Sequence, residues 1–388
     1  MILAHARVAL NATEAAGSNV EIRAGKILFL TSRSKSAPQL DLSGYLLLPG
    51  MINAHDHLEF NLFPRIGRGP YPNAAAWARD IYHPRRDPIR QHLRVPKAVR
   101  LFWGGLKNLL SGVTTVAHHN PYDAAVFDHG FPVRVVKNFG WSHSLDFSPN
   151  LIEDYRRTPR RWPFILHAAE GTDECARNEI CRLDRSGVLG PRTVLVHAVA
   201  ADPNLIRRRR ASIVWCPSSN LLVLDRTLSA ETFRSGVPIA LGTDSALTAQ
   251  GDLADEIAVA RKIRRITAEE AFAMVTSRAA QILRLSAGAG TIRDRGVADL
   301  IAVRDRGKAP VTALTGLSPE LVFVGGELKL ASPGLAAQLP SAERARLQPI
   351  EIEGRGRFLV AADVHGLYNQ TAAVLGRDFQ LAGRRVGL

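Results

Sequence analysis

The stretch LLLPGMINAHDHLEF, residues 46 to 60, is an apolar segment that ends in two histidines, His55 and His57. If the apolar part is a β-strand, alternate side chains point to the same side, so both imidazoles lie on one face, close enough to bind one ion. A single pair of this kind is more often incidental than functional. Its meaning therefore depends on ligands that other parts of the chain supply.

Three further apolar segments end in residues of the metal-ligand type. They are FILHAAE, which contains His167, TVLVHAV, which contains His197, and VPIALGTD, which ends at Asp244. In a parallel barrel the C-terminal ends of the strands meet at one rim, so residues distant in the sequence converge there. Three imidazoles and one carboxylate are a suitable set for Zn²⁺ with room for a water. Gly-Thr-Asp-Ser is also typical of a turn, but its position after an apolar strand favours a ligand role for Asp244.

Two residues near these ligands have the chemistry of a proton-transfer site. Glu170 comes three residues after His167. A carboxylate beside a metal, but not on it, can take a proton from water and pass it to a leaving nitrogen. The alternative for Glu170 is an exposed loop acid. His197 is either a further ligand or a group that orients the attacking water, and the position of Glu170 favours the second role.

The chain pattern predicts an α/β protein with a (β/α)8 TIM-like barrel. Residues 1–48 contain short strands, residues 49–290 alternate apolar strands with amphipathic helical stretches, and residues 291–335 return to short strands. We expect a small composite β-sandwich from both chain ends and leave residues 336–388 as an extension of unknown role. Helix is predicted in TAEEAFAMVTSRAAQILRL, which starts with a capping box at Thr267 and Glu270.

The barrel is predicted to be irregular around strands 3 to 4. Only about 50 residues separate GVTTV from ILHAAE, which is short for two intervening βα units. The segment VRVVKNFG is an obvious strand, and WSHSLDF leaves room for a short one. Lys137, in VVKNFG, could be a carboxylated lysine that bridges two metals only in a different branch of the family that the motifs resemble, as described below.

Composition excludes several classes of protein. The 388 residues are 46% hydrophobic and 22% charged, without an apolar run near the roughly 18 residues of a membrane span. The start of the chain lacks the pattern of a secretory signal, and three cysteines without a CxxC pair suggest neither disulfides nor a cysteine zinc site. We therefore expect a cytoplasmic protein. The net charge of +14 is spread along the chain with 6% aromatic residues, which argues against nucleic-acid binding despite the run Arg207 to Arg210.

Taken together, the motifs resemble the amidohydrolase superfamily, in its mononuclear cytosine-deaminase-like or triazine-hydrolase-like branch. The resemblance is carried in order by PGMINAHDHLEF, SGVTTV, ILHAAEG, LVHAV, WCPSSNLLVL and ALGTDSAL, and extends to about residue 335. It implies one divalent metal, zinc or alternatively iron, on His55, His57, His167 and Asp244, with Glu170 as proton shuttle and His197 positioning water or substrate. Asp244 would thus serve both the metal and catalysis.

The same resemblance implies hydrolytic attack on an sp² carbon that bears nitrogen. Deamination of a nitrogen heterocycle or a related amidine with ammonia release is the favoured reaction. The alternatives are hydrolysis of an amide or ring C–N bond, displacement of a halide from a heterocycle, or an inactive barrel that serves as a scaffold. The expected partner is a small-molecule substrate, and the expected assembly is a homodimer or larger homo-oligomer.

Substrate contacts are expected around the rim of the barrel. The candidate substrate contacts, chosen from their positions near the predicted strand ends and loops, are Glu59, Asn61, His118, His119, Trp103, Ser219 and Asn220. Strand alternation allows only one of His118 and His119 to point inward. Trp103 is equally suited to the core and to a pocket wall. The residues after the H-x-H pair, LEFNLFPRIGRGPYPNAAAWARDIYHPRRDP, are predicted to form a lid.

Overall fold

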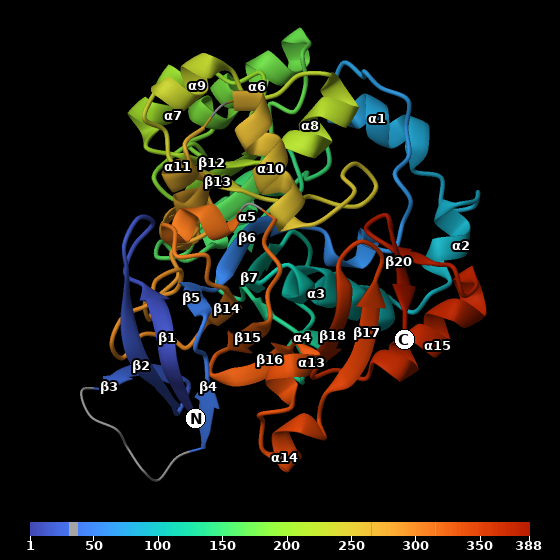
Figure 1. Ribbon diagram of the computed structural model, residues 1–388. Helices are drawn as coiled ribbons and strands as arrows, with labels where there is room; N and C mark the ends of the chain where they lie inside the picture. Colours follow the sequence, from blue (N-terminus) through green and yellow to red (C-terminus); the bar gives the residue numbers. More distant parts are fainter. Residues whose placement is uncertain (31–37, 265, 315) are drawn as a thin grey trace.

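Figure 1 shows a computed structural model of the chain, which describes residues 1–30, 38–264, 266–314 and 316–388. Residues 31–37, which belong to the N-terminal segment with predicted strands, lie outside the described residues. Parallel strands surrounded by helices occupy one part of the molecule, and a long mixed sheet built from both chain ends occupies the other.

The parallel strands form two sheets whose spatial order follows chain order. One contains β6 (Met51–Asp56), β7 (Val113–His118) and β8 (Arg134–Val135), and the other contains β9 (Gly140–Trp141), β10 (Phe164–Ala168), β11 (Thr193–His197), β12 (Ser212–Trp215) and β13 (Ile239–Leu241). The two sheets meet where the Thr243 amide donates to the carbonyl of His55 at 2.9 Å. An isolated bridge between Asp56 and Asp244 lies at the same place.

The strands β8 and β9 are only two residues long, and no ladder joins them in the described part of the chain. This break falls in the region where the chain length leaves little room for two βα units. β9 coincides with the start of WSHSLDF. The neighbouring strands β10 and β11 are buried along their whole length, as expected for parallel strands that are covered on both faces.

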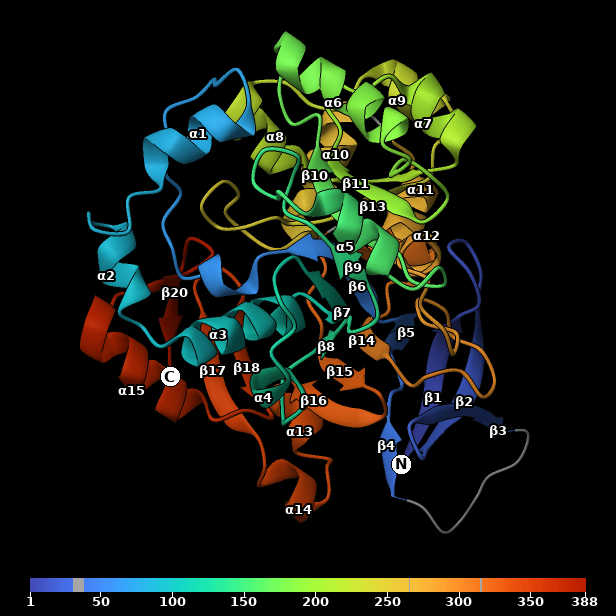
Figure 2. The ribbon, with the colours of Figure 1, turned by 180° about the vertical axis from the view of Figure 1, so that it is seen from behind.

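Helices connect the parallel strands and surround them (Figures 1 and 2). They are α3 (Lys97–Leu110), α4 (Ala124–Phe127), α5 (Leu151–Arg157), α6 (Glu174–Arg185), α7 (Pro203–Arg209), α8 (Pro217–Leu224), α9 (Ala230–Arg234) and α10 (Leu253–Arg264). In α6 the buried residues Ala176, Ile180 and Leu183 recur at helical spacing, so one stripe faces the strands.

The segment predicted as one helix from Thr267 forms two, α11 (Ala268–Met274) and α12 (Ser277–Ile282). The predicted capping box is present, because the side chains of Thr267 and Glu270 each bond to the other residue's backbone N–H. The helix is interrupted at Thr276, whose φ of −134° and ψ of −107° are not helical.

Within the described residues, both chain ends contribute to one twelve-stranded sheet. Its N-terminal strands are β1 (Ile2–Ala9), β2 (Ala15–Arg23), β3 (Lys26–Leu30), β4 (Gln39–Asp41) and β5 (Tyr45–Pro49). Its C-terminal strands are β14 (Leu300–Arg304), β15 (Leu321–Val324), β16 (Glu327–Ala331), β17 (Gln348–Ile352), β18 (Gly356–Val360), β19 (Gln380–Leu381) and β20 (Arg384–Gly387). β5 pairs with β14 in antiparallel register from Tyr45 with Arg304 to Pro49 with Leu300.

The sheet therefore continues beyond residue 335 into the segment whose role the sequence left open. Short helices flank its C-terminal strands: η2 (Pro310–Leu314), α13 (Pro333–Ala336), α14 (Ser341–Arg344) and α15 (Val364–Leu375). Near the H-x-H pair lie η1 (Leu58–Phe60), α1 (Ala74–Ile81) and α2 (Ile89–Leu93).

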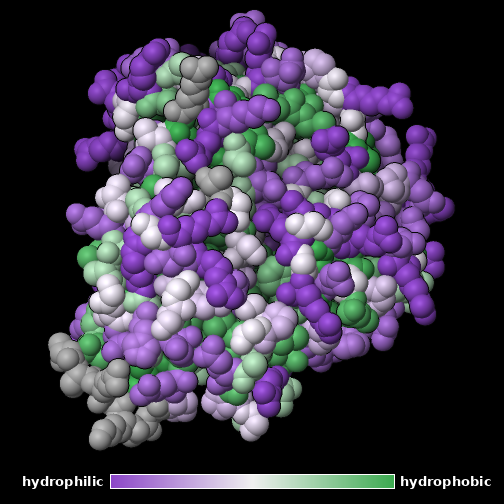
Figure 3. Space-filling model, in the orientation of Figure 1, coloured by the Kyte–Doolittle hydropathy of each residue, from purple (hydrophilic) through white to green (hydrophobic). Residues whose placement is uncertain are grey.

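The surface in Figure 3 is covered mainly by hydrophilic side chains, with apolar ones scattered between them. Among the described residues, no helix combines the length and the apolar composition that a membrane crossing needs.

Candidate metal centre

Four side chains from distant parts of the sequence converge at the ends of the parallel strands. The potential ligand atoms of His55, His167, His197 and Asp244 all lie within 4.8 Å of one another, and the four residues are buried. Nε2 of His55 is 3.2 Å from Nε2 of His167 and 3.5 Å from Oδ1 of Asp244. Such a group of imidazoles and a carboxylate fits the donor preference of Zn²⁺.

The backbone turns sharply at two of these positions. His197 ends β11 with φ of 71°, and Asp244 lies beyond β13 with φ of 57°. Left-handed backbone at a non-glycine residue costs about 1 to 3 kcal/mol and is typical of functional sites. Hydrogen bonds from the amides of Thr243 and Asp244 to the carbonyl of His55 hold this turn against β6.

His57 lies beside the four-residue group. Its Nε2 is 3.5 Å from Oδ1 of Asp244, and its ring stacks on His167 with 5.4 Å between centroids. The strand β6 ends at Asp56 and η1 begins at Leu58, so His57 has left the extended conformation that the alternation argument assumed. Nε2 of His57 is nevertheless closer to the Asp244 carboxylate than Nε2 of His197, which lies 3.9 Å from Oδ2.

The hydrogen bonds of two imidazoles direct their second nitrogens toward the centre. Nδ1 of His167 lies 2.9 Å from the carbonyl of His143, and Nδ1 of His197 lies 2.7 Å from Oδ1 of Asn220. Because both partners are acceptors, each Nδ1 carries the proton, which leaves the Nε2 lone pairs free for an ion.

Burial keeps two of the imidazoles neutral. It lowers the pKa of His55 to about 4 and places the pKa of His167 well below its ordinary value. Burial alone would raise the pKa of Asp244, but the hydrogen bond with His55 and the surrounding imidazoles hold that pKa well below normal. Neutral imidazoles beside an ionised carboxylate are the protonation states that a metal needs.

Glu170 lies next to His197 at the edge of this group. Its Oε1 is 3.5 Å from Nε2 of His197, and burial raises the pKa of Glu170 to about 7. The preceding turn is fixed by Glu179 on α6, whose carboxylate accepts the amide N–H of Ala169 at 2.5 Å. The carboxyl group of Glu170 is thus placed to exchange protons near neutral pH.

Ser219 and Asn220, which the sequence predicted as substrate contacts, form hydrogen bonds with Asp244 and His197. The hydroxyl of Ser219 donates to Oδ2 of Asp244 at 2.6 Å, and Asn220 accepts from His197. Both side chains are fully buried on α8 and lie outside the cavity above the centre. Thr248 also donates to Oδ2 of Asp244, at 3.1 Å.

Asp56, between the two histidines, points away from the centre into a buried polar cluster. Its Oδ2 is 2.9 Å from Nζ of Lys107 and accepts from Asn108 at 2.8 Å. Asn61 donates to its other oxygen and accepts from Lys107. Sequence reasoning missed Lys107 and Asn108, although two polar residues on the apolar helix stretch LFWGGLKNLL were a detectable signal.

Asn61 and Trp103 were predicted substrate contacts, and the structure contradicts both. Asn61 is 0% exposed because the Asp56 cluster uses its side chain. Trp103 is also 0% exposed, and its Nε1 donates to Oγ1 of Thr371 on α15 at 2.8 Å. A buried amide and a buried indole each need a partner, and both find it inside the protein.

His118 is the last residue of β7, His119 follows it, and neither lines the cavity. The ring of His119 packs 4.3 Å from that of His167, and its Nε2 lies 3.2 Å from the carbonyl of Ser142. His118 accepts the amide N–H of Leu58 at 3.3 Å. Both side chains are buried, and a direct contact of either with substrate stays a prediction.

Above the metal centre lies a cavity of about 610 Å³. Its walls are largely apolar and include Phe60, Trp77, Ile81, Tyr82, Phe147 and Leu247, while its floor contains His57, His167, Glu170, His197 and Asp244. Glu59 lines it too, with Oε1 accepting from Asn120 at 2.6 Å. Of the predicted substrate contacts, Glu59 alone faces this cavity among the described residues.

The predicted lid covers the cavity through α1. The helix begins at Asn73, whose side chain accepts the amide N–H of Ala76. The amide of Ala74 donates to the carbonyl of Glu170 at 2.9 Å, so the lid is tied to the loop that carries Glu170. Trp77, Ala78, Arg79 and Ile81 of this helix line the cavity.

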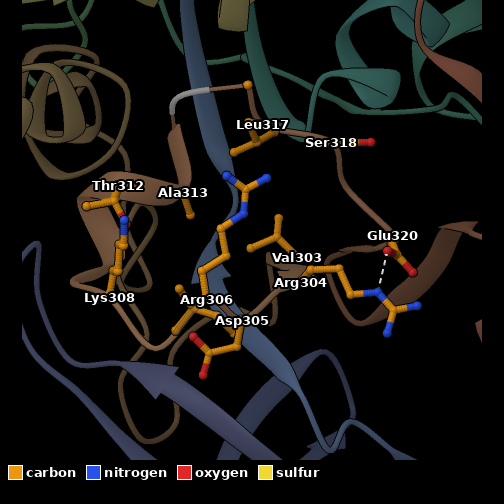
Figure 4. A pocket seen from close by; sticks show the side chains of 12 residues that line it. Val303, Arg304, Asp305, Arg306, Lys308, Thr312, Ala313, Leu317, Ser318 and Glu320 are labelled. Carbon is orange, nitrogen blue, oxygen red and sulfur yellow. Dashed lines mark hydrogen bonds and ion pairs between the residues drawn. The ribbon is translucent and has the colours of Figure 1, made fainter.

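Lys137 does not approach the centre. Its side chain is 59% exposed and pairs with Asp128 at 3.1 Å. A second cavity, of about 110 Å³, lies between β14 and η2 (Figure 4). It is lined by Arg304, Asp305, Arg306 and Lys308 but contains none of the clustered histidines, and Arg304 is already paired with Glu320 at 2.8 Å.

Comparison with known proteins agrees with this geometry. Residues 159–329 match the model of the amidohydrolase family. A curated 5-methylthioadenosine/S-adenosylhomocysteine deaminase of Syntrophobacter fumaroxidans is 25% identical over 349 residues, covering 71% of this chain and 75% of the relative. Over residues 159–329 the chain is thus similar to the amidohydrolase family, which is the resemblance that the sequence motifs predicted.

Two solved structures have the same fold as this chain. An adenosine deaminase from Xanthomonas campestris with bound zinc has a TM-score of 0.71 at 17% identity, covering 96% of this chain and 98% of its own. Atrazine chlorohydrolase from Arthrobacter aurescens TC1, complexed with zinc, has a TM-score of 0.69 at 17% identity, covering 96% and 99%. The resemblance predicted from the sequence motifs is confirmed, and the fold is of the TIM-barrel type.

Proposed function

We propose that this protein is a metal-dependent deaminase that hydrolyses a C–N bond at an sp² carbon of a nitrogen heterocycle and releases ammonia. The observation that carries the proposal is the convergence of His55, His167, His197 and Asp244 beside Glu170 at the floor of a largely apolar cavity. Imidazoles, a carboxylate and a separate acid with a pKa near neutrality are the parts that hydrolytic deamination requires.

We assign His55, His57, His167 and Asp244 as ligands of one divalent ion, Zn²⁺ in preference to Fe²⁺. His57 is included because its Nε2 and that of His55 are both 3.5 Å from Oδ1 of Asp244. His197 is kept for the attacking water or the substrate, since its Nε2 is the nitrogen that faces Glu170. The ion would act as a Lewis acid that lowers the pKa of water toward about 7.

The protein side chains would then guide the proton and the attacking water. Glu170 takes the proton from the attacking water and delivers it to the leaving amine. The lone pair on Nε2 of His197 accepts a hydrogen bond from the attacking water and orients it, and Asp244 helps to orient the same water. Ser219 and Thr248 hold the Asp244 carboxylate in place through the two hydrogen bonds to Oδ2.

The substrate proposed is a purine-like heterocycle or nucleoside. Support comes from the cavity of about 610 Å³, which is within the usual range for small-molecule sites, and from the aromatic side chains of Phe60, Trp77 and Tyr82 that can cover a planar ring. The similar curated deaminase is named for two adenosine derivatives.

An alternative reaction is displacement of a halide or hydrolysis of another C–N bond with the same ligands. The structural likeness to an atrazine chlorohydrolase favours keeping this alternative. The inactive scaffold is less well supported, because all the residues that the chemistry needs are present and close together.

Several wider features also stay proposals. We infer that the eight parallel strands form a (β/α)8 barrel that is open between β8 and β9, followed by a composite domain of both chain ends. A cytoplasmic location agrees with three free cysteines, and a homodimer or larger assembly is the expected state.

The experiment combines metal analysis with an ammonia-release screen over purines, nucleosides, pterins and triazines. We expect about one zinc per chain and turnover that falls about 10²- to 10⁴-fold in Glu170→Gln. Glu174→Gln, an exposed acid on α6, is the matched control. Absence of metal in the wild-type protein, or undiminished turnover in Glu170→Gln, would contradict the proposal, and chloride release without ammonia would favour the alternative.

A further inference from the structure

The C-terminal segment, residues 348–388, contributes no side chain to the metal centre or to the cavity above it. It contains β17, β18, α15, β19 and β20, and it contacts the protein at three places that support the centre. We propose that this segment is a positioning element, which holds in register the chain segments that carry the ligands of β6 and β13. The inference rests on the metal site of the proposed function.

The first contact joins the two loops that follow the ligand strands. The amide of Ala382 donates to the carbonyl of Asn61 at 2.7 Å, and its carbonyl accepts from the amide of Gly251 at 2.8 Å. Asn61 follows His57 and Gly251 follows Asp244 in the chain. Ala382 is 3% exposed and has φ of 49°. One residue of the C-terminal segment thus bridges the loops on both sides of the centre.

The second contact is a cluster of ion pairs at the start of α10. Arg355 and Arg384 both lie beside Asp252 and Asp255, and Nη2 of Arg384 is 2.8 Å from Oδ2 of Asp255. Asp252 is 6% exposed. Its Oδ2 faces the arginines, and its Oδ1 accepts the amide N–H of Ala254 at 2.9 Å. The two arginines therefore stabilise a buried carboxylate that also caps the helix.

This cluster is linked to the centre through α10 and α8. Glu256, on the first turn of α10, accepts the amide N–H of Ser218 at 3.2 Å. The next residue, Ser219, donates to Asp244, and Asn220 accepts from His197. A shift of α10 would move the start of α8 and with it the groups that orient Asp244 and His197.

The third contact reaches the strand β6 from behind. Thr371 on α15 accepts from the indole of Trp103 on α3 at 2.8 Å, and α15 packs against α3. The helix α3 also carries Lys107 and Asn108, which bind the side chain of Asp56, the residue between His55 and His57 in the sequence. The three contacts therefore converge on the supports of β6 and β13.

Such outer supports affect a metal through the position of its ligands, without adding a ligand. The test is Zn²⁺ affinity, measured by competition with a chromophoric chelator, together with the visible spectrum of the Co²⁺ form. We expect Arg355→Met to weaken Zn²⁺ binding about threefold to tenfold and to change the Co²⁺ spectrum, because couplings of this kind are of modest size. Arg355→Lys should recover part of the affinity.

Thr371→Val is the second variant, because it removes the hydroxyl that accepts from Trp103 while it keeps the shape of the side chain. We expect Thr371→Val, like Arg355→Met, to weaken Zn²⁺ binding and to change the Co²⁺ spectrum. Arg209→Met is the matched control, since it breaks the ion pair of Arg209 with Asp184 on the outer helices. Its Zn²⁺ affinity and Co²⁺ spectrum should equal those of the wild type.

The outcomes separate this inference from the proposed function. Wild-type protein that binds no stoichiometric metal overturns both. Wild-type protein that binds zinc, with unchanged affinity and spectrum in Arg355→Met and Thr371→Val, overturns the positioning role alone. If Arg355→Met does not fold, Thr371→Val decides the question.

Discussion

Glu256 gives the protein a stability that depends on pH in a calculable way. The residue is 2% exposed, one carboxylate oxygen accepts from Ser218, and the other has no partner among the described residues. Burial raises its pKa from 4.5 to about 7. At a pH below the pKa of Glu256 in the unfolded protein, the carboxyl is protonated in both the folded and the unfolded state. As the pH rises, the unfolded state ionises first, so the free energy of unfolding falls until the pH exceeds the folded pKa.

The perturbation that tests this is Glu256→Gln, which keeps an acceptor for Ser218 but cannot ionise. From the two pKa values, the carboxyl costs about 1 kcal/mol near pH 5.5 and about 3 kcal/mol near pH 8.5. The variant should therefore gain about 2 kcal/mol over the wild type between these pH values.

The assay is urea unfolding of both proteins at the two pH values, with the same zinc concentration throughout. Because the metal ligands are common to both proteins, their own titration cancels in the difference. Glu269→Gln, an exposed acid on α11, serves as control and should show no gain. A difference between Glu256→Gln and wild type that stays constant with pH within about 0.5 kcal/mol would refute the reasoning.

Three further predictions concern the supports of the centre and the metal itself. Lys107→Met should lower the free energy of unfolding by about 3 to 5 kcal/mol, because it leaves the carboxylate of Asp56 buried without its cation; a loss below about 1 kcal/mol in urea unfolding would contradict this. Ser219→Ala should weaken Zn²⁺ binding about tenfold in chelator competition, since Asp244 loses the hydrogen bond of 2.6 Å, and unchanged affinity would argue against a role for that bond. Removal of metal with a chelator should lower the melting temperature, and added Zn²⁺ should restore it, because the ion binds only the folded protein; a melting curve that ignores both treatments would contradict the site.

The strand-end residues were predictable because their signal is local. An apolar run that stops at His167, His197 or Asp244 indicates both a strand and the polar residue at its end. Parallel topology then brings these strand-end residues together. The capping box at Thr267 and Glu270 was predictable for the same reason, since its hydrogen bonds span three residues.

Contacts at the rim were less predictable. Asn61 and Trp103 occur near the ligands in the sequence or on the adjoining helix, yet both turn to buried partners, Asp56 and Thr371. Ser219 and Asn220 face Asp244 and His197 instead of the cavity. Which way a side chain turns depends on partners far away in the chain, and no local pattern contains that information.

By itself the sequence determined the chemistry of the site: the imidazoles, the carboxylate and the acid, and the strands at whose ends they occur. Only the tertiary structure decided how near the imidazoles come to Asp244, with Nε2 of His57 at 3.5 Å and Nε2 of His197 at 3.9 Å from its carboxylate. The structure likewise decided that residues 348–388 extend the mixed sheet and contact the supports of the centre. These features depend on hydrogen bonds and ion pairs between segments separated by up to about three hundred residues. They form only when the whole chain has folded.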